Sequence, residues 1–204
     1  MRIPNTVKIG AINFKVIQTK SDRKLKSPQD GIVENFATNI QKEEIYLFKD
    51  FNKDRLKLNL WLAIIQAILR ISNCQTKYDN IQDEMIMLYC FYDSYTELAN
   101  PDAFLRNIKT YKYTILGQNL KINITDDFNV ISKDAHGEFV PSENTINLYK
   151  NSKKSRMFIS FEHEIQELIF DITGNDYAQY NHDGFTELGE QICSFLMQNR
   201  FFSK

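Results

Sequence analysis

The strongest constraint on this chain is an internal repeat that spans nearly its whole length. Ile45–Lys49 reads Ile-Tyr-Leu-Phe-Lys, and Ile146–Lys150, which lies 101 positions further on, reads Ile-Asn-Leu-Tyr-Lys. Upstream, Asn13–Val16 matches Asn119–Ile122, and a glycine precedes each stretch by a few residues. Such a repeat indicates tandem copies of one structural unit. We therefore predict two modules, residues 1–103 and 104–204, each of a size at which small domains fold.

The hydrophobic periodicity predicts the same order of elements in both copies. Apolar residues alternate in the strand candidates and recur at helical spacing in the helix candidates. In the first copy, strands are predicted within 6–18 and 43–49, and helices at 54–72 and 81–98. In the second, strands are predicted at 109–116, 119–125 and 144–150, and helices at 154–173 and 184–199. We expect an α+β fold, in which each module is a small antiparallel sheet packed beside two helices. Apolar residues in the junction 100–107 predict that the modules pack together as an intramolecular pseudo-dimer.

Charge and hydropathy argue against several kinds of partner. The formal net charge of -1 gives no bulk attraction to nucleic acid or to an anionic membrane. Lys/Arg clusters at 20–26 and 150–156 flank predicted elements, and we interpret them as solvated loops. Nucleic-acid binding through these loops is the weakest functional hypothesis. No apolar run is long enough to span a bilayer and the N-terminus lacks a secretory leader, so we predict a cytoplasmic location without membrane association.

One helix candidate in the second copy carries residues typical of a metal site. His163-Glu164-x-x-Glu167 lies within the predicted helix 154–173. Side chains four positions apart share a helix face, so His163 and Glu167 can reach one ion. The zinc-peptidase pattern is His-Glu-x-x-His, and here Glu167 stands in place of the second histidine. A carboxylate still binds zinc, but its added negative charge makes a bound water harder to deprotonate and favours harder ions.

The order of these motifs resembles the small zincin-like metallopeptidase modules that phages and other mobile elements carry. The resemblance rests on Ile-Pro-x-Thr-x-Lys-Ile-Gly at 3–10, the repeated strand segments, the His-Glu helix and a last helix that ends near Asn199. It covers each copy nearly end to end. In the first copy, Leu62, Ala63 and Gln66 occupy the places of the three motif residues. The resemblance therefore implies that the first copy has lost its metal site and that the second retains part of one.

The second copy allows two interpretations of the same residues. The resemblance implies Glu164 as the catalytic base, His163 and Glu167 as ligands of one divalent metal such as zinc, and Glu187 or Glu190 as the third ligand. The other interpretation has no metal. His163 is then a hydrogen-bonded histidine at a former site, and the glutamates form the solvated faces of two amphipathic helices.

These interpretations lead to two functional hypotheses. The leading one is a non-enzymatic protein-binding factor of phage or mobile-element type, built on a degenerate zincin-like scaffold and needing no cofactor. Its partner would be a host protein in the host cytoplasm, and inhibition of a defence system such as CRISPR is one such role. The hypothesis rests on association with a family and not on a site. The alternative is a divalent-metal-dependent peptidase that uses the helix of His163, Glu164 and Glu167.

Overall fold

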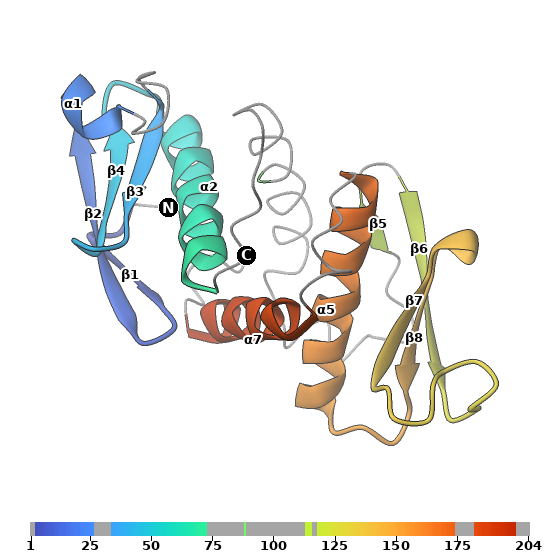
Figure 1. Cartoon of the computed structure of the whole chain (residues 1–204). Coiled ribbons are helices and arrows are strands. Elements are labelled where there is room, and N and C mark those ends of the chain that lie inside the picture. Colours follow the sequence, from blue (N-terminus) through green and yellow to red (C-terminus); the bar gives the residue numbers. More distant parts are fainter. Residues whose placement is uncertain are drawn as a thin grey trace. The chain divides into compact units, whose positions relative to one another are not determined.

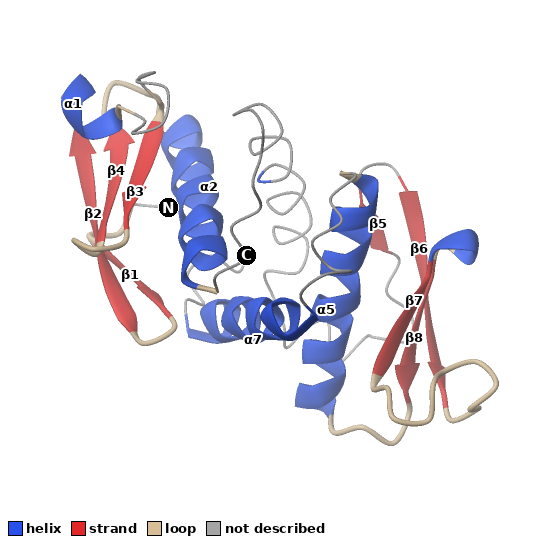
Figure 2. Cartoon of the chain, in the orientation of Figure 1, coloured by secondary structure: helices blue, strands red, loops and turns tan. Residues whose placement is uncertain are grey.

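The computed structural model describes residues 3–26, 34–72, 88, 113–115, 118–173 and 182–198. The chain divides into two compact units, Met1–Gln75 and Thr76–Lys204. Each unit contains a four-stranded sheet with a long helix beside it (Figure 1), and the helices and strands are distinguished in Figure 2.

The first unit has a sheet of strand order β1-β2-β4-β3. Its elements are β1 (Thr6–Ile9), β2 (Ile12–Thr19), α1 (Asp22–Leu25), β3 (Phe36–Asn39), β4 (Glu44–Phe48) and α2 (Lys53–Ile71). The outer pairs are antiparallel, whereas the central strands β2 and β4 are parallel. The side-chain oxygen of Asn52 accepts the N–H of Arg55 at 2.9 Å, which caps the start of α2. Helix α2 then packs against β1, β3 and β4.

The second unit repeats this topology with the order β5-β6-β8-β7. Its elements are β5 (Tyr113–Ile115), β6 (Gln118–Thr125), β7 (Gly137–Val140), the 3-10 helix η1 (Pro141–Glu143), β8 (Thr145–Tyr149), α5 (Lys154–Ile172) and α7 (His182–Gln198). The central strands β6 and β8 are again parallel. Helix α5 contacts β7 and β8 on one side and α7 on another.

The two sheets agree in backbone detail as well as in strand order. Glu43 and Asn144 occupy the same position before the fourth strand in chain order, and both adopt positive φ, 54° and 48°. Their carbonyl oxygens accept the N–H of Lys15 and Lys121 at 2.8 and 2.9 Å. Helices α2 and α5 each contain 19 residues and begin 101 positions apart. The repeat seen in the sequence is therefore a repeat of the fold.

Apolar side chains fill the space between each helix and its sheet. In the first unit Phe14, Ile45 and Leu60 are fully buried, and in the second Ile146 and Phe161 are. The ring of Phe161 meets that of Tyr113 edge to face, with centroids 5.4 Å apart. Each such side chain contributes about 1.5–3 kcal/mol by leaving water, so this interface fixes the helix on the sheet.

The predicted α+β class is confirmed, with one difference inside each sheet. The sheets are mixed and not wholly antiparallel, because the segment between β2 and β4 (20–43) is long enough to cross over and return in the same direction. Its counterpart between β6 and β8 does the same. The returning segments contain the short edge strands β3 and β7, which the periodicity did not predict.

Three expectations lie outside what the structure describes. The helix predicted at 81–98 and the boundary between residues 103 and 104 fall in the range from 73 to 112, of which only Leu88 is described. The packing of the modules as a pseudo-dimer stays a prediction. None of the described helices is long and apolar enough to cross a membrane.

Candidate functional site

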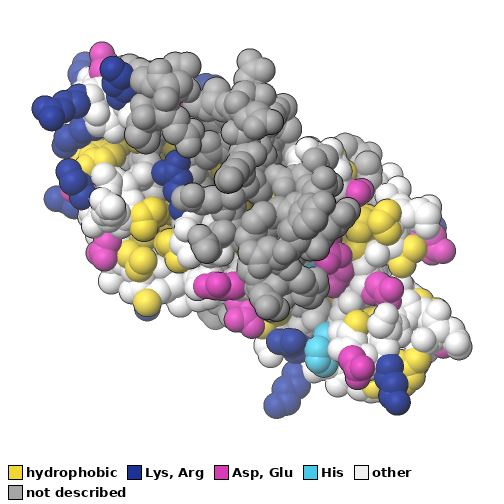
Figure 3. Space-filling view, viewed as in Figure 1, with side chains coloured by type: hydrophobic (Ala, Val, Ile, Leu, Met, Phe, Trp, Pro, Cys, Tyr) yellow, Lys and Arg dark blue, Asp and Glu magenta, His cyan; other side chains and the backbone are white. Residues whose placement is uncertain are grey.

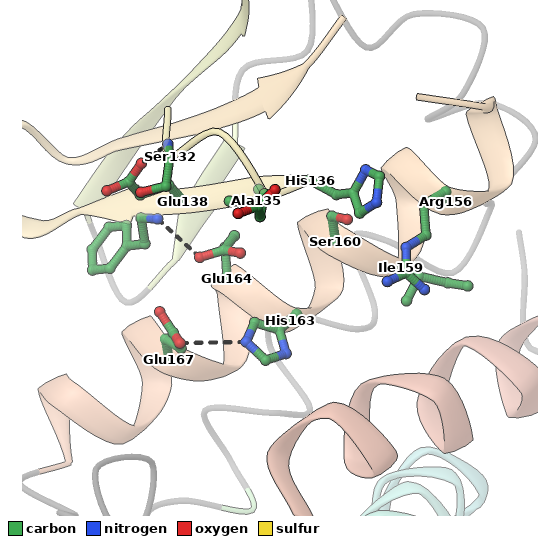
Figure 4. Close-up of a pocket in the computed structure, with 13 residues that line it drawn as sticks. Ser132, Ala135, His136, Glu138, Arg156, Ile159, Ser160, His163, Glu164 and Glu167 are labelled. Carbon is green, nitrogen blue, oxygen red and sulfur yellow. Dashed lines mark hydrogen bonds and ion pairs between the residues drawn. The ribbon is translucent and has the colours of Figure 1, made fainter. Parts of the chain in front are cut away.

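The predicted motif residues lie at a cavity between α5 and the edge strand β7. The cavity has a volume of about 470 Å³, and Figure 4 shows side chains of α5 facing the strand and the loop before it. It is lined by Ser132, Asp134, Ala135, His136, Gly137, Glu138, Phe139, Arg156, Ile159, Ser160, His163, Glu164 and Glu167. The structure therefore brings together the three motif residues of the second copy, as their helical spacing predicts.

His163 and Glu167 contact each other at the cavity. His163 Nε2 lies 3.3 Å from Glu167 Oε1 (Figure 4), and the two side chains are 15% and 32% exposed. The i, i+4 spacing on α5 places them on adjacent turns of one face. Both groups therefore have a partner within the protein itself.

Glu164 borders the same cavity beside Glu167, and its carboxyl also reaches into the contact between α5 and β7. Its side chain is only 5% exposed, and Oε2 accepts the backbone N–H of Phe139 at 2.9 Å (Figure 4). Burial and, after it, the negative charge of Glu167 raise the pKa of Glu164 to about 8, against the opposing effect of the Phe139 hydrogen bond. At pH 7 this carboxyl is accordingly held mainly as the neutral acid.

The hydrogen bond to Glu164 occupies a position on the open edge of the sheet. In the β7–β8 pair, the N–H of Tyr149 donates to the carbonyl of His136, so alternate residues of β7 turn their backbone groups toward β8. Phe139 belongs to the other set and directs its N–H away from the sheet. An edge N–H of this kind is a site for pairing with a further strand. In this protein Glu164 already occupies it.

Gly137 provides the space in which the Glu164 carboxyl lies. A Cβ atom at Gly137 would lie 2.8 Å from Glu164 Oε1 and 3.1 Å from Ser160 Cβ, closer than ordinary contact. In the first unit the positions equivalent to Gly137 and Glu164 hold Phe36 and Ala63. A large ring with a small partner there fills the volume that a glycine with a glutamate fills in the second unit.

In the first unit, other side chains form hydrogen bonds at the equivalent edge strand, β3. Thr38, the equivalent of Phe139, donates its hydroxyl to the carbonyl of Ala63 at 3.1 Å. Its own carbonyl, which faces away from β4, accepts a hydrogen bond from Arg70 Nη1 at 3.0 Å. A side chain of the helix that follows the sheet thus caps the edge strand in both units.

The two candidate third ligands lie elsewhere. Glu187 and Glu190 are exposed on α7, and neither lines the cavity. Gly189, between them, packs against α5, where its added Cβ would approach Gln166 Nε2 at 3.4 Å. In the part of the chain that the structure describes, no three His, Cys, Asp or Glu side chains converge in a way that could hold a metal ion. His163 and Glu167 supply two ligands of the three that a catalytic zinc needs.

Several residues of the site were not identified from the sequence. Gly137 and Phe139 lie on a segment that gave no chemical motif, and Arg156 belongs to the Lys/Arg cluster at 150–156 that was interpreted as a solvated loop. A signal was present, however, in the comparison of copies, which pairs Gly137 with Phe36. Glu162, on another face of α5, is fully buried, and its carboxyl oxygens have no hydrogen-bond partner among the described residues. Burial raises its pKa well above the usual value.

Comparison with known proteins adds no relative. No protein-family model matches the chain, and neither the curated proteins nor the solved structures give a significant match.

Proposed function

We propose that this chain is a non-enzymatic protein-binding factor on a degenerate zincin-like scaffold. The observation that carries the proposal is the state of Glu164, the residue that the resemblance assigns as catalytic base. It is buried, and its Oε2 accepts the Phe139 N–H. This hydrogen bond joins α5 to β7, so Glu164 has a structural contact at the position that the resemblance gives to the base.

The first unit supports the same proposal. Leu62 and Ala63 occupy the positions of His163 and Glu164 and are fully buried, so this copy has neither the histidine nor the first glutamate of the motif. Both units nevertheless retain the sheet, its register and the long helix. A scaffold that keeps its packing while its motif positions take up structural contacts is suited to presenting a surface.

The partner class follows from charge and from the resemblance. Figure 3 shows Lys and Arg side chains gathered over the visible part of the first unit and Asp and Glu side chains more frequent over the second, and the net charge of the whole chain is -1, which gives no bulk attraction to a polyanion. We propose a protein partner, and, if the chain is phage-encoded, a host protein in the host cytoplasm. Inhibition of a defence system such as CRISPR is one activity of this kind.

The cavity beside α5 favours one rival, a divalent-metal-dependent peptidase. His163, Glu164 and Glu167 border an open space of about 470 Å³ next to an edge strand, where a peptide has room to lie. Such an enzyme needs a further ligand, and Glu187 or Glu190 stays a prediction for that role. The rival therefore requires α7 to present a carboxylate that is exposed in this structure.

The two functions are separated by metal content and by the effect of two variants. The protein is purified without chelator, and bound metal is measured by mass spectrometry in wild type, His163→Ala and Glu164→Gln, with the exposed Glu143→Gln as control. The binding factor should hold less than about one tenth of an equivalent of metal, and both variants should retain partner capture. One equivalent that is lost in His163→Ala, together with proteolysis that is lost in Glu164→Gln, would replace the proposal by the peptidase.

A further inference from the structure

The exposed apolar side chains of the described surface come together in one turn of the second unit. Phe128 is 51% exposed and Val130 39%, and they are the large hydrophobic residues that the described surface leaves open to water. Both belong to the loop between β6 and β7. A solvent-exposed phenylalanine loses contact with water when a partner covers it, so such positions are favoured in interfaces.

The turn that carries these residues is held in one conformation. The carbonyl of Asp127 accepts the N–H groups of Val130 and Ile131 at 3.0 and 3.2 Å. Its carboxylate accepts both the backbone and the side-chain N–H groups of Asn129 at 2.9 and 2.8 Å. Ile131 is buried and anchors the end of the turn. The conformational entropy lost on binding is therefore small for this segment.

The sheet supports the turn from below. The ring of Phe128 stacks on Tyr149 at the end of β8, with centroids 5.8 Å apart and planes inclined by 28°. Asn147 Nδ2, also on β8, donates to the carbonyl of Val130 at 3.3 Å. In the described part of the corresponding connection, the first unit has the short helix α1 with the buried Leu25.

The loop that carries the two apolar side chains contains more carboxylates than basic side chains. Segment 126–138 contains Asp126, Asp127, Asp134 and Glu138 against the single Lys133. Asp126 is paired with Lys150 at 3.1 Å, and the excess negative charge remains with the other three carboxylates. A partner that buries Phe128 and Val130 must bring positive charge near them, because unpaired carboxylates lose hydration at an interface.

We propose that the docking turn, residues 126–131, inserts Phe128 and Val130 into an apolar pocket whose border carries lysine or arginine on the partner protein. This inference rests on the proposed binding function and assigns it a surface and a class of partner. The rigid turn supplies the apolar anchor, and the carboxylates that follow it select for a basic border.

The test uses a displayed library of random peptides, selected on the immobilised full-length chain at low salt. Wild type is compared with Phe128→Ser, Val130→Ser and, as matched control, Phe51→Ser. Phe51 contacts Phe48, which is the first unit's equivalent of Tyr149, with centroids 5.2 Å apart. Circular dichroism first establishes that each variant is folded, which the exposure of Phe128 leads us to expect.

The expected result is a set of peptides that combine large apolar residues with Lys or Arg. Their affinity should fall about tenfold or more in Phe128→Ser, stay within about twofold in Phe51→Ser, and decrease with added salt. The proposal for the docking turn would be overturned by peptides that bind Phe128→Ser as well as wild type, by selected peptides without basic residues, or by no enrichment at all. Sedimentation that shows a wild-type dimer lost in Phe128→Ser would also overturn it, because the turn would then contact a second copy. The proposed binding function is tested separately, by the measurements of metal content and proteolysis described above.

Discussion

Gly137→Ala should destabilise the second unit through Glu164 and not through the backbone. Gly137 has no positive φ, so alanine is compatible with its conformation. The added Cβ would lie 2.8 Å from Glu164 Oε1, and relief requires the carboxyl to move by about 0.5 Å or more. That movement stretches the 2.9 Å hydrogen bond to Phe139 beyond normal range. Overpacking together with a weakened buried hydrogen bond costs about 1–3 kcal/mol of unfolding free energy.

A double-mutant cycle isolates this cause. In a Glu164→Ala background, the added Cβ no longer meets Oε1 and Cγ of Glu164, while Ser160 Cβ at 3.1 Å remains, so the cost of Gly137→Ala should fall by about 1–2 kcal/mol. Glu164→Ala introduces the residue that the first unit has at the equivalent position, Ala63. Gly189→Ala is the control, because its Cβ would meet Gln166 at an ordinary 3.4 Å and should gain up to about 1 kcal/mol from helix propensity.

Urea unfolding measures the cycle. Far-UV circular dichroism follows the whole chain, and fluorescence of Trp61, the single tryptophan, reports on the first unit. The difference between the two signals identifies the transition of the second unit. Equal costs of Gly137→Ala in both backgrounds, within about 0.5 kcal/mol, would refute the reasoning, because the clash with Glu164 would then contribute nothing.

Four further results are expected. Because the folded-state pKa of Glu164 is raised to about 8 from a model value of 4.5, the folded protein retains a proton that the unfolded chain loses between these values. Stability should therefore fall as pH rises from about 5 to 8, and urea midpoints of Glu164→Gln should vary less over that range. The amide hydrogen of Phe139 should exchange faster in Glu164→Ala than in wild type, as measured by NMR; unchanged exchange would mean that the carboxyl does not protect it. Glu162→Leu should raise the free energy of unfolding by about 1–3 kcal/mol, since it removes a buried carboxyl without a partner among the described residues, and a lower urea midpoint would contradict this. Arg70→Met should lower thermal stability by about 0.5–1.5 kcal/mol through loss of the bond to the edge of β3, and no change in melting temperature would count against that contact.

The parts of this structure that sequence could predict are those set by local geometry. Helix α5 was expected at 154–173 and spans Lys154–Ile172, because its apolar residues recur with the helical period. The same spacing predicts that His163 meets Glu167, which lies 3.3 Å away. Strand β7 was missed because four residues, Gly-Glu-Phe-Val, are too short to show alternation. The parallel direction of the central strands was missed because side-chain alternation is the same for either direction.

The contact that determines what Glu164 does is of another kind. It joins residues 25 positions apart and depends on which backbone groups of β7 face outward, so neither residue alone predicts it. Helical spacing gave the right neighbours for His163 but could not give the direction of the Glu164 carboxyl. That direction separates a glutamate available to a metal-bound water from one bonded to the sheet edge. The chemical interpretation of the motif therefore depended on a tertiary contact.

The repeat nevertheless contains a signal of that contact. At the offset of 101 positions, Gly137 aligns with Phe36, and Glu164 aligns with Ala63. Each substitution alone would leave a void or a clash between strand and helix. Together they preserve the volume, because a glycine faces the long side chain and a phenylalanine accompanies the short one. When one position holds a larger residue in one copy and a second position holds a smaller one there, the two positions are expected to be in contact. Compared in this way, a duplicated chain indicates which edge residues pack against the motif helix before any coordinates are known.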